Sequence, residues 1–202
     1  MNTKSIFASN ISITSLDDEL NTIDVSNVEF DGAINAGQTS SKSKSLYILN
    51  DYKHLCIEIL NKFHEISYDV LRYNNSFTIS TSWITRVKPG DSSQYHCHKN
   101  SFYSGLYYFD DYRRDCGNIC FVNPLNQLSD FHLRPRESNL YNSEAWSYTP
   151  EKNALIFFPS YLWHTILNNL SDRVRYSLAF NIVPVGEYGN GDSTYNTEWF
   201  KK

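Results

Sequence analysis

The sequence predicts a mainly β protein, an antiparallel sandwich or barrel flanked by one helix. Short runs rich in β-branched and aromatic residues fill the second half of the chain, and turn residues close each run. A single long amphipathic stretch precedes them, so strands do not alternate with helices as they would in βαβ units. The 202 residues suffice for one domain with a full core, since a chain of this size buries roughly 70% of its unfolded surface.

The predicted strands follow Asn74-Asn75, where the character of the chain changes. They cover residues 77–87, 101–109, 117–122, 154–158 and 173–183. The segment 125–149 between them is polar and irregular, which favours a long loop near the mouth of a site. We expect a single domain over residues 1–202, with an N-terminal segment at 1–75, the β core at 76–185 and a C-terminal tail at 186–202.

A helix is predicted from about Asn50 to Arg72, where apolar residues recur every three or four positions. The apolar stripe consists of Tyr52, Cys56, Ile59, Phe63, Ile66 and Val70. Charged and amide residues lie between them, so we expect the helix to cover another element with one face. His54 and His64 fall in this helix, and we interpret them as structural or solvated. The helix is also a candidate face for a homodimer.

Charge and composition argue against several classes of protein. The net charge is -4 and no Lys/Arg cluster is longer than Arg113-Arg114, which gives no support for a nucleic-acid-binding surface. No segment approaches the ~20 apolar residues of a membrane span, and residues 1–20 do not read as a secretory signal. The four cysteines are irregularly spaced and too few to staple this domain. We therefore expect reduced thiols and a cytoplasmic protein.

Three histidines are candidate metal ligands. His96 and His98 follow a turn, and residues i and i+2 of a strand point to the same face, so both rings can reach one ion. His164 is the best third candidate because it follows an apolar strand that ends at Pro159. Imidazole nitrogens suit iron, zinc, copper and nickel. The His-x-His pair alone is more often two polar strand residues, and the full set is what favours a metal site.

The last predicted strand carries a candidate carboxylate-binding pair. Alternation places Arg173, Arg175, Ser177 and Ala179 on one face of this strand. A guanidinium binds a carboxylate bidentately, and a neighbouring hydroxyl adds a third hydrogen bond, so Arg175 and Ser177 form a suitable grip. For Arg173 we favour a surface ion pair with a local acid such as Asp172.

Further short motifs lie at regular intervals between residues 77 and 183. They are Ser82-Trp83, Pro89-Gly90, His96-x-His98, Asn100-Ser101, Ser104-Gly105-Leu106-Tyr107-Tyr108, Asn123-Pro124, Phe158-Pro159-Ser160-x-Leu162-x-His164, Arg175-x-Ser177 and Ala179-Phe180-Asn181. In this order they resemble the small Fe(II)/2-oxoglutarate-dependent oxygenases common in phage and bacterial genomes. The resemblance covers about half of the chain. It implies a double-stranded β-helix core of the jelly-roll or cupin-like type.

The resemblance also implies roles for the candidate residues. In such enzymes a histidine, a carboxylate two residues later and a distal histidine bind iron, and a later arginine binds the far carboxylate of 2-oxoglutarate. His96 takes the first position and His164 the distal one, while Arg175 and Ser177 form the arginine-serine pair. His98 stands where the family usually has aspartate or glutamate. The site would therefore carry one negative charge fewer than usual.

The implied activity is hydroxylation of a C–H bond coupled to decarboxylation of 2-oxoglutarate to succinate, with Fe(II) and 2-oxoglutarate as cofactors. Tyr108 and Trp83 are aromatic candidates for the wall of the cofactor pocket. The primary substrate is not named by any segment of the sequence. If the gene is phage-borne, the enzyme would act in the host cytoplasm.

Two alternatives stay open at this level. Much of the two cupin motifs is present, at Gly90, His96, His98, Pro159, His164 and Asn168. However, the stretch 99–103 lacks the glutamate that cupins carry after the His-x-His pair, and Tyr161 replaces a glycine. Jelly-roll folds also serve as non-catalytic binding modules, and the 15 tyrosines together with the segment 125–149 would suit a binding surface.

Overall fold

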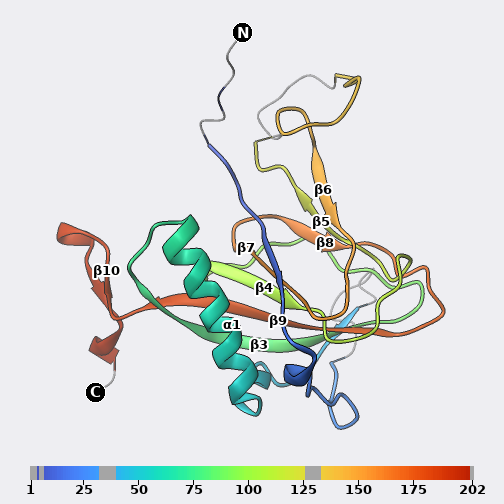
Figure 1. Ribbon diagram of the computed structural model, residues 1–202, viewed down its shortest axis with the longest axis horizontal. Coiled ribbons are helices and arrows are strands. Elements are labelled where there is room, and N and C mark those ends of the chain that lie inside the picture. Colours follow the sequence, from blue (N-terminus) through green and yellow to red (C-terminus); the bar gives the residue numbers. More distant parts are fainter. Residues whose placement is uncertain (1–3, 5–6, 32–39, 126–132, 201–202) are drawn as a thin grey trace.

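Two antiparallel sheets and one helix form three layers in the computed structural model, which describes residues 4, 7–31, 40–125 and 133–200 (Figure 1). The large sheet has the order β1 (Ser12–Ser15), β7 (Ala154–Pro159), β4 (Tyr103–Tyr107), β9 (Arg175–Val185), β3 (Ser76–Val87) and β2 (Ser41–Lys42). The small sheet has the order β6 (Ala145–Tyr148), β5 (Ile119–Val122) and β8 (His164–Ile166). The prediction of a mainly β protein with a flanking helix is confirmed.

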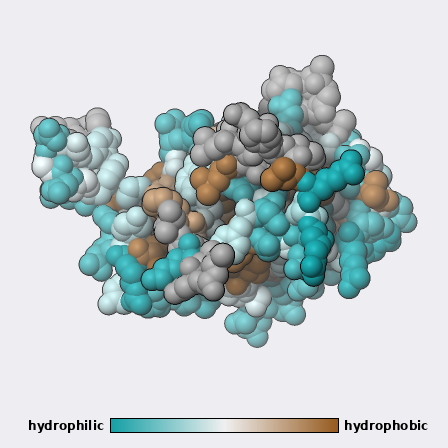
Figure 2. Space-filling model, turned by 90° about the horizontal axis from the view of Figure 1, so that it is seen from above, coloured by the Kyte–Doolittle hydropathy of each residue, from teal (hydrophilic) through white to brown (hydrophobic). Residues whose placement is uncertain are grey.

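The remaining elements are short. Helical turns lie at Asp18–Leu20, Ile48–Asn50, Gly191–Ser193 and Thr197–Phe200. Strands β10 (Glu187–Tyr188) and β11 (Tyr195–Asn196) pair with each other alone. This hairpin projects away from the sheets at the left of Figure 1, and it stands apart again at the left of Figure 2. The coloured part of the face seen in Figure 2 is mainly hydrophilic, with a few hydrophobic patches. Within the described ranges, no helix combines the length and the apolar character needed to cross a membrane.

The helix α1 (Lys53–Glu65) covers one face of the large sheet (Figure 1). Its buried residues Leu55, Ile59 and Phe63 pack against aromatic and aliphatic residues of β3, β4, β7 and β9. This packing buries the apolar stripe, which is the main source of stability for an amphipathic helix of this length.

The predicted bounds of the helix were wrong at both ends. The chain before Lys53 forms a separate turn at Ile48–Asn50, and after Glu65 the helix widens into a π-helical turn at Ile66–Val70. Arg72 then takes a positive φ of 62°, which ends the helix because a left-handed residue cannot continue it. As a result Val70 lies outside the packed stripe, with 61% of its surface exposed.

The segment 125–149 is not a loop throughout. Residues 145–148 form β6, which pairs with β5 in register Phe121↔Trp146. The expectation of an irregular segment was therefore wrong for these four residues. The alternation of β6 is hard to recognise in the sequence because it is an edge strand, exposed on most of its length. Residues 126–132 lie outside the described residues.

The second core lies between the two sheets. It combines apolar residues of the large sheet, such as Leu106 and Ile156, with Ile119, Phe121 and Ile166 of the small sheet. Alternation along β9 places Leu178 and Phe180 toward α1 and residues 175, 177 and 179 toward the small sheet. The candidate site lies between this inner face of the large sheet and the small sheet, with Arg175 in β9 and His164 in β8.

Removing the aromatic ring from the helix–sheet contact tests this packing. Phe63 is fully buried and its ring meets Phe77, Tyr103 and Phe157. We expect Phe63→Ala to lower the free energy of unfolding by about 3–5 kcal/mol. Ile57→Ala on the exposed side of α1, where 53% of Ile57 is accessible, should change it by less than about 0.5 kcal/mol. Urea denaturation followed by circular dichroism measures both, and equal effects would contradict the layer order.

Candidate metal centre

The backbone brings the three predicted ligands together. His96 and His164 form an antiparallel bridge, with His96 N–H donating to the His164 carbonyl at 3.0 Å and the reverse bond at 2.8 Å. The N–H of His98 donates to the carbonyl of Ser160 at 2.9 Å. The segment of His96 and His98 is thus extended but belongs to no regular strand, contrary to the prediction. It pairs instead with the connection that leads from β7 into β8.

The side chains of His96, His98 and His164, here called the histidine triad, converge on one point. One ring nitrogen from each lies within 4.8 Å of the others. The Nε2 atoms of His98 and His164 are 3.4 Å apart, and their rings are parallel to within 3°. This spacing is what three ligands of a single ion require. No Cys, Asp or Glu of the described residues joins this cluster.

Backbone carbonyls fix the orientation of two of the rings. The Nδ1 of His96 lies 2.8 Å from the carbonyl of Gln94, and the Nδ1 of His164 lies 2.9 Å from the carbonyl of Leu162. A carbonyl can only accept, so Nδ1 carries the proton in both rings and Nε2 keeps a free lone pair. Bonds of this kind orient histidine ligands in metal sites.

Burial keeps the rings in the state that binds metal. The pKa of His164 is lowered to about 3 and that of His98 to about 4. Burial is the main cause of both shifts, and the neighbouring His96 adds to them. Both rings are therefore neutral at pH 7, since the pKa lies well below that pH. Imidazole ligands fit iron, zinc, copper or nickel better than magnesium or calcium, which prefer oxygen ligands.

A second polar site lies across from β8, on the inner face of the large sheet, at Arg175 of β9. This residue is 1% exposed, and its Nη1 donates to the carbonyl of Gly117 at 3.3 Å. Its Nε and Nη2 have no partner among the described residues. The rings of Tyr108 and Tyr112 lie on the guanidinium, each with its centroid 5.8 Å from Cζ. A buried cation without a counter-charge costs several kcal/mol, which points to an anionic ligand.

Two hydroxyls complete this second site. The Oγ of Ser177 and the hydroxyl of Tyr108 are also buried and without a partner in the described structure. Burial raises the pKa of Tyr108 while Arg175 lowers it, so the phenol stays a hydrogen-bond donor. We call Arg175, Ser177 and Tyr108 the carboxylate pocket, because its unpaired donors match the acceptors of a carboxylate group.

Trp83 belongs to the metal side rather than to the carboxylate pocket. Its ring stacks on His98 with centroids 5.6 Å apart and 27° between the planes. In the sheet it is paired with Ala179, two residues beyond Ser177 on the same face. The predicted role of Trp83 in binding a cofactor therefore stays a prediction. The structure places it as a wall of the triad.

Several other sequence expectations can be checked directly. His54 and His64 are exposed on α1, away from the triad. Arg173 is exposed as expected, but the predicted partner Asp172 bonds Arg113 instead, at 3.1 Å. That choice follows from the turn before β5, which brings Arg113 within reach of both Asp115 and Asp172.

The sequence did not point to Tyr112 or to the carbonyl of Gly117. Tyr112 packs on Arg175 and its hydroxyl donates to the carbonyl of Tyr176. A backbone carbonyl leaves no signal in the sequence. Tyr112 follows β4 in a loop, where no alternation rule assigns its side.

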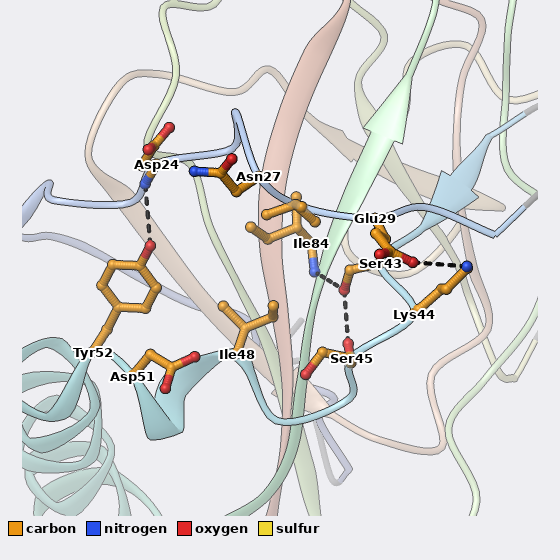
Figure 3. Close-up of a pocket in the computed structure, with 11 residues that line it drawn as sticks. Asp24, Asn27, Glu29, Ser43, Lys44, Ser45, Ile48, Asp51, Tyr52 and Ile84 are labelled. Atoms are coloured by element: carbon orange, nitrogen blue, oxygen red, sulfur yellow. Dashed lines mark hydrogen bonds and ion pairs between the residues drawn. The ribbon is translucent and has the colours of Figure 1, made fainter.

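A pocket of about 410 Å³ lies elsewhere on the molecule (Figure 3). Its lining includes Asp24, Glu29, Lys44 and Tyr52, and it shares no residue with the triad. Three of its charged groups already have partners, because Lys44 pairs with Glu29 at 2.8 Å and the Asp24 carboxylate accepts hydrogen bonds from the N–H and the hydroxyl of Ser26 at 2.9 and 2.8 Å. It is therefore a weaker candidate than the triad, whose ring nitrogens converge with free lone pairs.

Comparisons with known proteins agree with this geometry. Residues 81–181, half of the chain, match the family described as "Putative 2OG-Fe(II) oxygenase". No curated protein matches the chain. The family match favours the oxygenase interpretation over the cupin and binding-module alternatives.

Solved structures share the fold. The epimerase SnoN from nogalamycin biosynthesis, a non-heme alpha ketoglutarate dependent enzyme, is 11% identical with a TM-score of 0.63, covering 90% of this chain and 82% of its own. A Pseudomonas putida prolyl-4-hydroxylase is 14% identical with a TM-score of 0.55, covering 86% and 92%. HygX from Streptomyces hygroscopicus, with nickel and 2-oxoglutarate bound, is 11% identical with a TM-score of 0.55, covering 87% and 83%. The double-stranded β-helix prediction is thereby confirmed.

Cobalt binding tests the triad directly. The metal-free protein should bind one equivalent of Co(II) and develop visible d–d absorption. His164→Ala should weaken binding by more than the roughly 10–100-fold that follows loss of a ligand's hydrogen-bond partner. His54→Ala, at an exposed histidine of α1, is the matched control and should bind as the wild type does. Retention of full affinity in His164→Ala would exclude this centre.

Proposed function

The chain belongs to the 2OG-Fe(II) oxygenase family, and from this premise we propose that the histidine triad binds the ferrous ion and the carboxylate pocket binds 2-oxoglutarate. The observation that carries the proposal is the pairing of two incomplete sites between the two sheets. Three imidazoles converge without an acidic ligand among the described residues, and a buried arginine lacks a counter-charge. A dianionic cosubstrate would complement both.

The triad fits ferrous iron. Its three nitrogens lie within 4.8 Å of one another, so they could bind one ion as a facial triad does and leave positions open for other ligands. When bound, iron supplies the activation of O2 that is coupled to oxidative decarboxylation of 2-oxoglutarate. The protein's part is to hold neutral imidazoles in place. A third imidazole in place of a carboxylate leaves the site one unit more positive, which favours binding of an anionic cosubstrate.

The carboxylate pocket fits the far end of 2-oxoglutarate. Arg175 can offer Nε and Nη2 to both oxygens of one carboxylate, and Ser177 and Tyr108 add hydroxyl donors. The aromatic rings of Tyr108 and Tyr112 hold the guanidinium, so little rotamer freedom is lost on binding. This pocket therefore sets the position of the cosubstrate relative to the triad.

Water is excluded from the inner end of the site. His164 is 4% exposed and its ring packs against Phe121 and Phe158. His96 and His98 are half-buried, so the open side of the triad lies beside them. We propose that the primary substrate approaches from that side and is hydroxylated at a C–H bond. The overall reaction would convert substrate, O2 and 2-oxoglutarate into hydroxylated product, succinate and CO2.

We further infer a reducing, cytoplasmic setting, which the four free thiols support. They are Cys56, Cys97, Cys116 and Cys120. A homodimer through α1 remains a proposal. The outer side of this helix carries the exposed Ile57 but is otherwise mainly polar.

Replacing the buried arginine tests the carboxylate pocket. Arg175→Met should weaken binding of 2-oxoglutarate to the nickel-loaded protein at least about 100-fold, because two charge-assisted hydrogen bonds contribute about 3 kcal/mol or more. The unfolding temperature of the metal-free variant should be equal to or higher than that of the wild type, since an unpaired buried charge is removed. Arg173→Met, at an exposed position of the same segment, is the matched control. Isothermal titration calorimetry gives both affinities, and equal affinities for the two variants would refute the role of Arg175.

A further inference from the structure

The loop between β4 and β5, residues 108–118, contacts the guanidinium of Arg175 with three groups. The carbonyl of Gly117 accepts a hydrogen bond from Nη1 at 3.3 Å, and the rings of Tyr108 and Tyr112 have their centroids 5.8 Å from Cζ. Both ring distances are in the range of a cation–π contact. The loop therefore fixes how far the guanidinium reaches into the carboxylate pocket.

Two of these contacts come from groups that cannot move. Gly117 has a positive φ of 86°, and a Cβ there would collide with the carbonyl oxygen of Leu167. Tyr108 is completely buried and packs in the core between the two sheets. Because protein interiors are close-packed, neither group can withdraw without a shift of the backbone or the core around it.

Tyr112 differs from these two because it also borders open space. It is half-buried, and it lines a surface cavity of about 520 Å³ together with residues 114 and 149–152. Among the described residues, Arg175 does not line this cavity. Tyr112 is therefore shared by the cavity and the guanidinium, and its side chain separates the carboxylate pocket from the cavity.

Contacts with β9 and β4 hold Tyr112 in this place. Its hydroxyl donates to the carbonyl of Tyr176, the residue after Arg175. The N–H of Tyr176 in turn donates to the carboxylate of Asp110 at 3.4 Å. The ring of Tyr112 meets that of Tyr108 edge-on, with centroids 5.1 Å apart and 88° between the planes. Burial raises the pKa of Tyr112 well above its ordinary value, so the side chain is a neutral wall and supplies no counter-charge.

We propose that Tyr112 is a specificity-determining residue, which sets the length of the dicarboxylate that fits between the histidine triad and Arg175. This inference rests on the proposed function, because it takes the triad and the guanidinium as the two anchors of 2-oxoglutarate. A diacid with one more methylene needs the guanidinium to lie farther from the triad. The ring of Tyr112 occupies the space into which the guanidinium would withdraw.

Two dicarboxylates that differ by one methylene test the proposal. Isothermal titration calorimetry of the nickel-loaded protein gives the affinities for 2-oxoglutarate and for 2-oxoadipate. The wild type should prefer 2-oxoglutarate by about 10–200-fold, which is the discrimination that a pocket achieves for one methylene. Tyr112→Ala should reduce this preference at least about 5-fold, because the guanidinium gains room to withdraw.

Three further variants isolate the contribution of the ring. Tyr112→Phe restores the ring and lacks only the hydroxyl, so the preference should stay within about 3-fold of the wild type. Tyr141→Ala, at a tyrosine with 63% of its surface exposed, is the matched control and should bind both acids as the wild type does. If Tyr112→Ala does not fold, Tyr112→Leu replaces it, and a loss of preference in the same direction is expected.

The outcomes distinguish the role of Tyr112 from the proposed function. The role of Tyr112 would be overturned by a wild type without preference, or by an unchanged preference in folded Tyr112→Ala or Tyr112→Leu, even if both affinities fall together. An equal loss of preference in Tyr112→Phe would also overturn it, because the effect would then belong to the hydroxyl. Failure of the wild type to bind 2-oxoglutarate, or wild-type affinity in Arg175→Met, would instead overturn the proposed function itself.

Discussion

The pair of backbone hydrogen bonds between His96 and His164 is the constraint on which the site depends. It joins the segment before β4 to the start of β8. The two histidines lie 68 residues apart in the sequence, from position 96 to position 164. The bridge fixes the separation of the two backbones from which the imidazoles extend, and the side chains take no part in it. Each ring is then oriented by a carbonyl two residues away, so the same short segments supply both position and orientation.

The inner face of the large sheet holds more polar groups than stability alone would favour. Arg175, Ser177 and Tyr108 keep donors unpaired in the described structure, and each such group lowers the stability of the fold. The apolar packing of α1 on the opposite face offsets this cost. The helix side of the large sheet thus contributes apolar packing, and the side of the small sheet carries the proposed binding site.

Much of this arrangement could be predicted from the sequence because it follows the alternation of strands. The facing of Arg175 and Ser177 follows from period two along β9. His96 and His98 converge as the same rule predicts, although their extended segment is an isolated bridge and not a regular strand. Gly105 stands in a recognisable motif for a physical reason, since a Cβ there would collide with the ring of Phe180.

The parts that could not be predicted depend on tertiary context. The bulge after Ile79 reverses the facing of β3, and no residue in that run marks it. The end of the helix depends on the left-handed conformation of Arg72, a residue that is usually helical. Asn181 has the right parity to face the inner side, but its hydrogen bonds to Thr81 and Ser104 become visible only when the register brings these residues to either side.

The central claim is that three imidazoles and no carboxylate hold the iron, with 2-oxoglutarate anchored at Arg175. The most direct test is a crystal structure of the protein prepared anaerobically with Fe(II) and 2-oxoglutarate, with anomalous scattering recorded at the iron edge. The account predicts an iron peak bonded to a nitrogen of His96, His98 and His164, and a carboxylate of 2-oxoglutarate on the guanidinium of Arg175. An iron peak with the ring of His98 turned away and an acidic side chain in its place would contradict it.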